Sequence, residues 1–250
     1  MAEFIIIIRP EPDASRDVMW LDRYKVPAIG APVMHAAPHR MDVPDPSGFQ
    51  AIIFTSRHAV TAFVDADKPA AWLSMPVYAV GRGTAQAAKN SGYRSVITGH
   101  GGGGGLVPLI LANLRPENGK LFWPAAQSIS FDMTAQLAPY DFVVDRHTAY
   151  AMPMADNLSQ HLLAPLTACQ SAAVVAMSAR SLSVFRRLLD AAGCASYRSK
   201  ITVIAGSAGI AAAAGPGWGG TLVARAPRRS RLLAIATMLH RRRTLPQHTR

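Results

Sequence analysis

The chain alternates short apolar runs with longer stretches in which apolar residues recur at helical spacing. Nine runs have the length and composition of buried strands: FIIII, AIIFTS, PVYAVG, RSVIT, KLFW, DFVVD, AAVVAMS, KITVIAG and GTLVA. Strand-like runs separated by helical stretches are typical of parallel sheets covered by helices. The pattern therefore predicts an α/β fold.

A weak internal repeat divides this pattern into two halves. The segment AIIFTSRHAVTAF aligns with AAVVAMSARSLSVF so that Ser56 matches Ser178 and Phe63 matches Phe185. Each copy reads as strand, serine and helix. A second unit of the same plan follows each copy, PVYAVGRGTAQAAKNSGY in one half and KITVIAGSAGIAAAAGPGW in the other. The repeat predicts two similar lobes, each a parallel sheet flanked by helices.

Two proline-rich connections, residues 34–48 and 146–157, mark where the chain passes between the lobes. Crossings near residues 36 and 150 predict an inserted lobe of residues 37–150. The outer lobe then combines residues 1–36 with residues 151–250. A run of five glycines at 101–105 lacks the G-K-[ST] ending of a phosphate loop, so we expect a flexible surface loop before a helix at Leu106 to Leu114.

Charge is unevenly distributed along the chain. The formal net charge is +11, and residues 191–250 hold ten basic residues and no acidic one. A basic tail can bind nucleic acid or stay solvated, whereas basic groups around a cleft attract a polyanionic small molecule. The terminal segment PRRSRLLAIATMLHRRR is amphipathic with a basic end. This favours a docked final helix over contact with nucleic acid or a membrane surface.

Other classes of protein are disfavoured by the cysteines, the histidines and the amino terminus. Cys169 and Cys194 belong to no C-x-x-C pattern, and the histidines lack metal-ligand spacing. We therefore expect no metal and no disulfide, and a reducing cytoplasm fits. The apolar run in MAEFIIIIRP is too short for a signal peptide or a membrane span.

The stretch VYAVGRGTAQAAKNSGYRSV predicts a strand, a tight turn at Gly81-Arg82-Gly83 and a helix that Thr84 opens and caps. A dinucleotide fingerprint needs a third glycine where Gln86 stands and an acidic residue about 20 positions later, so that site is excluded. The turn still presents backbone amides at a helix start, which favours an anion. A capped helix without a ligand is the alternative.

Similar helix starts recur at Thr55-Ser56-Arg57, at Ser178-Ala179-Arg180 and at Gly206-Ser207. Four helix starts with hydroxyls at the carboxyl ends of strands, two from each lobe, would converge on one crevice. This predicts a cleft that holds several carboxylates. The sequence around Ser207 also approximates a nucleophile elbow, but no acidic residue follows it, which excludes a serine hydrolase triad.

The order of several segments closely resembles the uroporphyrinogen-III synthase family. These segments are AIIFTSRHAVTAF, PVYAVGRGTAQAAKNSGY, KLFWPAAQSISFDMTAQL, HTAYAMP, AVVAMSARSLSVF and ITVIAGSAGIAAAA. The best-matched parts are FTS at 54–56 and AVGRGTA at 79–85. The chain departs from the family at WPAAQS, where an arginine and a glycine are usual. It departs again at SAGIA, where Ser207 alone remains of the usual hydroxyls.

The resemblance implies a cofactor-free hydro-lyase of two α/β lobes joined by a two-stranded connector, with its active site in the cleft between them. Its substrate would be hydroxymethylbilane, a linear tetrapyrrole with eight carboxylates. The family removes the terminal hydroxyl as water and closes the ring with inversion of ring D through a spiro intermediate. We further expect a cytoplasmic monomer with no membrane or nucleic-acid partner.

The resemblance assigns the role of general acid to Tyr150. The equally weighted alternative is that Tyr150 is a hinge residue that only packs. A non-catalytic, two-lobed module that binds anions or tetrapyrroles is the alternative to an enzyme. The residues expected to bind substrate are Arg9, Thr55, Ser56, Arg57, Arg82, Gly83, Thr84, Ser178, Ala179, Arg180 and Ser207.

Overall fold

The computed structural model describes residues 2–241 of the chain. These residues divide into two compact units. The first, here called the split unit, contains the residues up to His35 and those from Pro153 onward. The second, the inserted unit, is Ala36–Met152.

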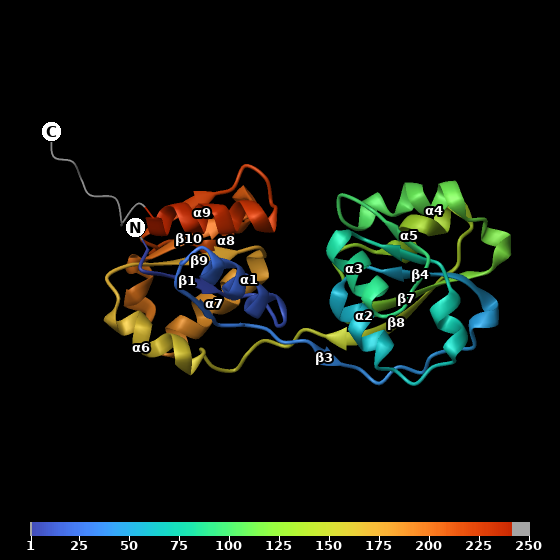
Figure 1. The fold of residues 1–250 in the computed structure, drawn as a ribbon, viewed down its shortest axis with the longest axis horizontal. Coiled ribbons are helices and arrows are strands. Elements are labelled where there is room, and N and C mark those ends of the chain that lie inside the picture. The colour runs from blue at the N-terminus through green and yellow to red at the C-terminus, as the bar shows by residue number, and fades with distance from the viewer. Residues whose placement is uncertain (1, 242–250) are drawn as a thin grey trace. The chain divides into compact units, whose positions relative to one another are not determined.

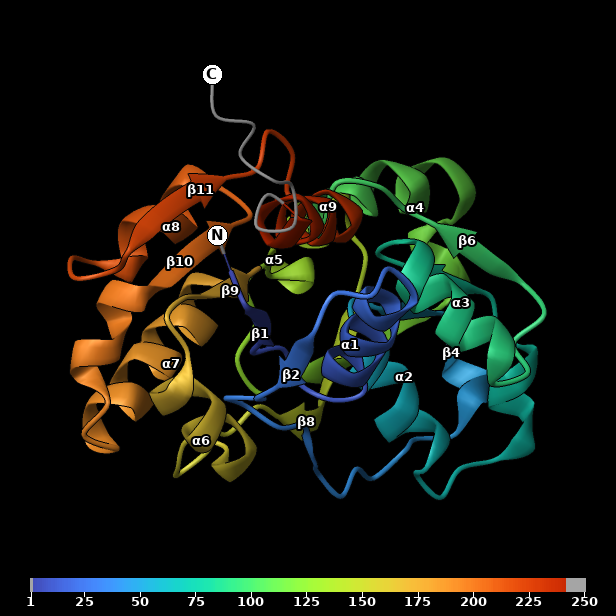
Figure 2. The same cartoon turned by 60° about the vertical axis from the view of Figure 1, so that its left-hand side comes forward.

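The split unit is built on a parallel sheet of five strands in the order β11-β10-β9-β1-β2 (Figure 1). Apolar residues of α1 and α9, among them Leu21 and Leu232, are buried against Ile5 and Ile7 on one face of this sheet. On the other side α7 contacts β9, and Figure 2 shows α8 beside β10 and β11. The elements are β1 (Phe4–Ile7), α1 (Asp13–Arg23), β2 (Ala28–Gly30), α6 (Gln160–Ala168), β9 (Ala172–Ala176), α7 (Ala179–Ala191), β10 (Ile201–Ala205), α8 (Ala208–Ala214), β11 (Gly220–Val223) and α9 (Arg229–Arg241).

The inserted unit contains a sheet of six strands in the order β3-β8-β7-β4-β5-β6. All neighbours are parallel except β3, which pairs antiparallel with β8. Its two faces are covered by α2 with α3 and by α4 with α5 (Figure 1), which bury Phe54 and Phe122 on one side and Ile53 and Trp123 on the other. The elements are β3 (Ala37–Pro38), β4 (Phe49–Phe54), α2 (Arg57–Val64), β5 (Val77–Ala79), α3 (Arg82–Asn90), β6 (Val96–Thr98), α4 (Val107–Asn113), β7 (Lys120–Ala126), α5 (Met133–Leu137) and β8 (Val144–Ala151).

Short 3-10 helices complete both units: η1 (Pro46–Gly48), η2 (Ala70–Ser74), η3 (Gly103–Gly105), η4 (Pro116–Asn118), η5 (Ala138–Tyr140) and η6 (Ala195–Lys200). No helix within residues 2–241 has the length and apolar character needed to cross a membrane.

The two segments that cross between the units are hydrogen bonded to each other as antiparallel strands. Ala37 pairs with Ala151, and Pro38 pairs with Tyr150. Beyond this pairing, the His35 N–H donates to the Pro153 carbonyl oxygen over 3.2 Å. The crossings therefore form the two-stranded connector that the family resemblance implies.

The predicted α/β fold with parallel sheets is confirmed, and each of the nine apolar runs contributes a strand. The strand expected at DFVVD begins only at Val144 and continues to Ala151. The prediction missed β2 and β3 because a strand of three or two residues leaves too short a periodic pattern to recognise.

The prediction of a turn at Gly81-Arg82-Gly83 with Thr84 as the cap is wrong. Gly81 is the N-cap residue in an extended conformation, and α3 begins at Arg82. Thr84 is already the third helical residue and only 7% of it is exposed. An N-cap side chain must precede the first helical residue to reach the free N–H groups, which the position of Thr84 does not allow.

The glycine run lies at the surface before α4, as predicted, with Gly101, Gly102 and Gly104 exposed. Its last three residues form the 3-10 helix η3, and two of them are closely packed. A Cβ atom built on Gly105 would lie 1.6 Å from the carbonyl oxygen of His100, and one on Gly103 would lie 2.5 Å from Phe131 Cδ1. Glycine is needed at these positions because the neighbouring groups occupy the space of a side chain.

The prediction of a docked final helix is confirmed by α9, whose residues Leu232, Leu233 and Ala236 are buried. Arg242, Arg243 and Arg250, which contribute to the basic segment, lie outside the described residues.

Candidate functional site

Three of the predicted hydroxyl residues are helix N-caps. The side-chain oxygens of Ser56, Ser178 and Ser207 accept hydrogen bonds from the backbone N–H three residues later, over 3.0, 3.4 and 3.3 Å. Each serine has extended backbone and directly precedes α2, α7 or α8. The serines in the repeated pattern of strand, serine and helix are therefore N-cap residues.

A pocket of about 320 Å³ lies within the inserted unit, where several parallel strands end at the same edge of the sheet. Its walls come from the residues that follow β4 and β7, from β8 itself and from the glycine run. No acidic side chain lines it. Five of the lining residues carry a hydroxyl: Thr55, Ser56, Ser128, Ser130 and Tyr150.

Tyr150 contributes the phenol of this pocket from near the end of β8. Only 6% of the residue is exposed, and its hydroxyl lies 2.8 Å from Ser56 Oγ. Burial raises the pKa of Tyr150, and the hydrogen bond with Ser56 opposes this shift. The phenol therefore carries its proton at neutral pH.

Either hydroxyl can donate in the hydrogen bond between Ser56 and Tyr150. Ser56 Oγ also accepts from the N–H of Ala59, and its one proton can be donated to the phenolic oxygen. When the Ser56 hydroxyl donates to the Tyr150 oxygen, the Tyr150 O–H can donate its proton to a group in the pocket.

Thr55 is oriented by a buried tryptophan. The Trp123 Nε1–H donates to Thr55 Oγ1 over 3.3 Å, and Trp123 also lines the pocket. Trp123 packs in the core and in addition fixes one pocket hydroxyl.

The starts of α2 and α3 lie side by side in the inserted unit. A Cβ atom built on Gly83 would be 3.7 Å from Arg57 Nε, so the Arg57 side chain runs along the first turn of α3. Arg82 is exposed in the same turn. The neighbouring strands β4 and β5 place these two helix starts at one edge of the sheet.

In the split unit, Ser178 and Arg180 are exposed, whereas Ala179 and Ser207 are half-buried. They follow β9 and β10, which are neighbours in the sheet, so the two helix starts share its carboxyl edge. The structure thus brings the predicted residues together in pairs of adjacent helix starts within each unit.

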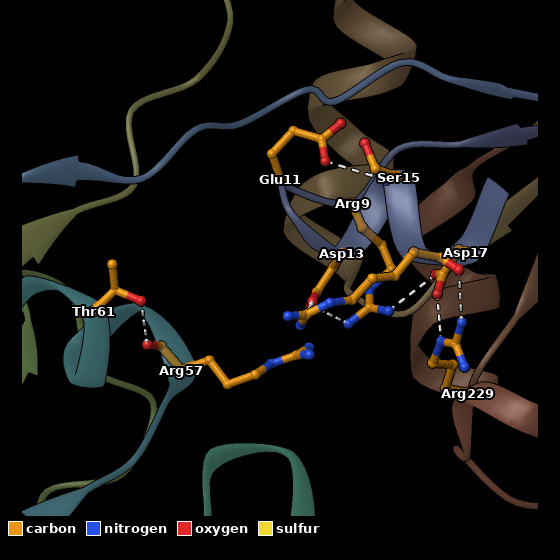
Figure 3. Close-up of polar contacts among 9 residues, drawn as sticks. Arg9, Glu11, Asp13, Ser15, Asp17, Arg57, Thr61 and Arg229 are labelled. Carbon is orange, nitrogen blue, oxygen red and sulfur yellow. Dashed lines mark hydrogen bonds and ion pairs between the residues drawn. The ribbon is translucent and has the colours of Figure 1, made fainter. Parts of the chain in front are cut away.

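Arg9 belongs to a network of ion pairs at the end of β1 that the sequence did not reveal (Figure 3). Its Nη1 donates to Asp17 over 2.9 Å, and its Nη2 pairs with Asp13. Arg229, at the start of α9, pairs with the other oxygen of Asp17. Because 1% of the Asp17 side chain is exposed, this carboxylate is almost fully removed from water.

Sequence reasoning also missed the loop from Ala126 to Phe131 and the glycine run as parts of the pocket. Both loops follow parallel strands, β7 and β6, so each lies at the carboxyl edge that holds Thr55 and Ser56. The position after a strand was therefore a usable signal, although Ser128 and Ser130 belong to no recognised motif. Within residues 2–241, no three His, Cys, Asp or Glu side chains are grouped to hold a metal ion.

Comparison with known proteins identifies the family. Residues 19–234 match the family model of uroporphyrinogen-III synthase HemD. A search of curated proteins found no match.

Solved structures share the fold at low sequence identity. The uroporphyrinogen-III synthetase of Helicobacter pylori superposes with a TM-score of 0.64 at 16% identity, over 96% of this chain and 100% of that one. A mutant uroporphyrinogen III synthase from Thermus thermophilus gives a TM-score of 0.53 at 16% identity, over 97% of this chain and 99% of that one. At this identity the likeness concerns the fold, and the function rests on the family match. The chain therefore belongs to the uroporphyrinogen-III synthase family, cofactor-independent lyases that cyclise hydroxymethylbilane to uroporphyrinogen III in tetrapyrrole biosynthesis.

Proposed function

We propose that the pocket of the inserted unit is where this chain acts on hydroxymethylbilane, and that Tyr150 is its proton donor. The observation that carries the proposal is the buried phenol of Tyr150 at the wall of a pocket lined by hydroxyls. The absence of an acidic residue among the lining side chains supports it, because a carboxylate there would repel the polyanionic substrate.

The proposed first step is loss of the terminal hydroxyl as water. Tyr150 donates its proton to the leaving oxygen as the carbon–oxygen bond breaks, which gives the azafulvene cation and a phenolate. The proton of the Ser56 hydroxyl stabilises that phenolate through the 2.8 Å hydrogen bond. Ring closure through the spiro intermediate later releases one proton, which restores the phenol and completes the balance.

Ring closure with inversion of ring D requires the enzyme to hold the substrate in one coiled conformation. Hydroxyl and amide donors suit carboxylates, and Thr55, whose Oγ1 accepts from Trp123, can donate its own proton to one in the pocket. Ser56 lines the same wall and acts through its hydrogen bond with Tyr150. We propose that Arg57, Arg82 and the first turn of α3 bind further carboxylates. The remaining proposed contacts are Arg9, Gly83, Thr84, Ser178, Ala179, Arg180 and Ser207.

We further propose that the protein works as a monomer in the cytoplasm, without a metal or a nucleic-acid partner. Cys169 and Cys194 are free thiols, which suits a reducing compartment. The apolar side of α9 is buried against the sheet, so this helix packs in the core of the split unit.

Replacement of Gly103 by alanine tests whether the pocket binds substrate. The added Cβ would lie 2.5 Å from Phe131 Cδ1, so Phe131 or the glycine run must move and the pocket changes shape. We expect kcat/KM for hydroxymethylbilane to fall about tenfold, as misplacement of binding groups commonly causes. Steady-state kinetics on purified variants give the answer.

Gly104→Ala is the matched control, because its added Cβ lies 3.6 Å from the nearest Phe131 atom, an ordinary contact. Its kcat/KM should stay close to that of the wild type. Equal values for Gly103→Ala and Gly104→Ala would place the substrate elsewhere.

A further inference from the structure

Arg146 of β8 does not line the pocket, but it contacts the lining residues Trp123 and Ala126 and the next residue, Gln127. It lies opposite Trp123 in the register of these two strands. Its Nη2 donates to the carbonyl oxygens of Ala126 and Gln127, each over 3.0 Å. These two residues begin the loop that carries Ser128 and Ser130 into the pocket.

The guanidinium of Arg146 also lies over the indole of Trp123, with 5.6 Å between Cζ and the ring centroid. This distance is within the range of a cation–π interaction. Trp123 in turn donates its indole N–H to Thr55 Oγ1. Arg146 therefore contacts the residue that orients Thr55 as well as the start of the serine loop.

The same loop is tied to the backbone of Tyr150. The register between β7 and β8 shifts after Ala125, so that Ala126 pairs with Tyr150 and Ala149 is left without a partner in the ladder. The Gln127 N–H then donates to the Tyr150 carbonyl oxygen over 2.8 Å. The extra residue of this bulge is on β8, and Arg146 binds the carbonyls of Ala126 and Gln127 at the end of the neighbouring strand β7.

We propose that Arg146 is a positioning residue for this pocket, which sets the serine loop and the Thr55 hydroxyl in place for the substrate. The inference rests on the proposed function, because it assumes that the pocket binds hydroxymethylbilane. Arg146 acts through Trp123, Ala126 and Gln127 and touches neither substrate nor reacting atoms. In this proposal Ser128 and Ser130, which line the pocket, bind the substrate.

Arg146→Lys and Arg146→Gln separate positioning from folding. Arg146 is exposed, so both variants should unfold at the temperature of the wild type within a few degrees. Lysine keeps the charge but lacks the planar group that stacks on an indole while donating to two carbonyls. We expect KM for hydroxymethylbilane to rise about threefold for lysine and about tenfold for glutamine, since loss of one or two hydrogen bonds is worth that factor.

KM is the informative quantity because it does not depend on the fraction of active protein. A purely structural role would lower kcat through loss of folded enzyme and leave KM unchanged. The matched control is Arg94→Lys, an exposed arginine of the same unit outside the pocket, which should leave both constants unchanged.

A double-mutant cycle with Ser128→Ala tests whether Arg146 affects KM by positioning the loop that carries Ser128. If Arg146 acts by placing the loop, Ser128→Ala costs less in the Arg146→Gln background than in the wild type. Unchanged KM in both Arg146 variants, or full additivity with Ser128→Ala, would overturn the inference. If Gly103→Ala is impaired while the Arg146 variants are normal, only the role of Arg146 fails; if Gly103→Ala is also normal, the pocket assignment itself fails.

Discussion

Replacement of Tyr150 by phenylalanine should lower kcat for the cyclisation about 100-fold, with KM changed by less than about threefold. General acids contribute about 100- to 10,000-fold to enzymatic rates. The lower end applies here because the bilane loses its hydroxyl and closes without a catalyst. Phenylalanine keeps the ring that packs in the core of the inserted unit, so the change removes only the proton donor and its hydrogen bond with Ser56.

The pH dependence of kcat gives a second measurement on the same group. Burial raises the pKa of Tyr150 above its ordinary value of about 10, so the acid form persists through neutral and weakly alkaline pH. Ionisation of Tyr150 should therefore cause no loss of kcat between about pH 7 and pH 9. A loss should appear only above the ordinary tyrosine pKa, where the phenol gives up its proton.

Tyr140→Phe is the matched control, because Tyr140 belongs to the same unit and is 50% exposed. It should leave kcat and KM at the values of the wild type. Wild-type kcat in Tyr150→Phe would assign the proton to water or to the substrate's own carboxyl groups, and Tyr150 would then be a packing residue of the connector.

Replacement of Asp17 by asparagine should produce the largest loss of stability among the variants considered. The Asp17 carboxylate is buried and pairs with Arg9 and Arg229, which joins the end of β1 to α1 and α9. Removal of one partner of a buried ion pair costs about 3 kcal/mol. Here Arg229 loses its carboxylate, and Arg9 keeps only its pair with Asp13. Urea unfolding followed by circular dichroism should show the loss in the transition of the split unit.

Asp22→Asn on the same helix is the control for this experiment. Asp22 is exposed in α1, so its replacement should change the free energy of unfolding by less than about 0.5 kcal/mol. Equal stability of Asp17→Asn and Asp22→Asn would contradict the structural role given to the Asp17 network.

Local sequence rules predicted the features that depend on neighbouring residues. The apolar runs fold as strands, and the serines at 56, 178 and 207 cap helices, because a strand core and an N-cap are each determined within a few positions. The same rules failed at Thr84. Gly81 has no side chain to act as a cap, and only the observed backbone shows that the helix begins directly after it.

The features that sequence reasoning missed depend on residues far apart in the chain. Asp17 lies 212 positions from Arg229, so no local pattern pairs them. The pocket combines loops that follow β4, β6 and β7, and strand order decides that these loops meet. In the sequence, nothing distinguishes Arg146 from other basic residues. Only the register of β7 and β8 shows that it lies opposite Trp123.

The most direct test of the central claim is isomer analysis of the product. Freshly prepared hydroxymethylbilane is incubated with the purified full-length protein, the porphyrinogens are oxidised, and the ratio of type III to type I uroporphyrin is measured by chromatography. An enzyme that directs inversion of ring D gives mainly type III, whereas the unaided reaction closes without inversion. Type III product in excess over a protein-free control is the predicted result, and type I product alone would contradict the account.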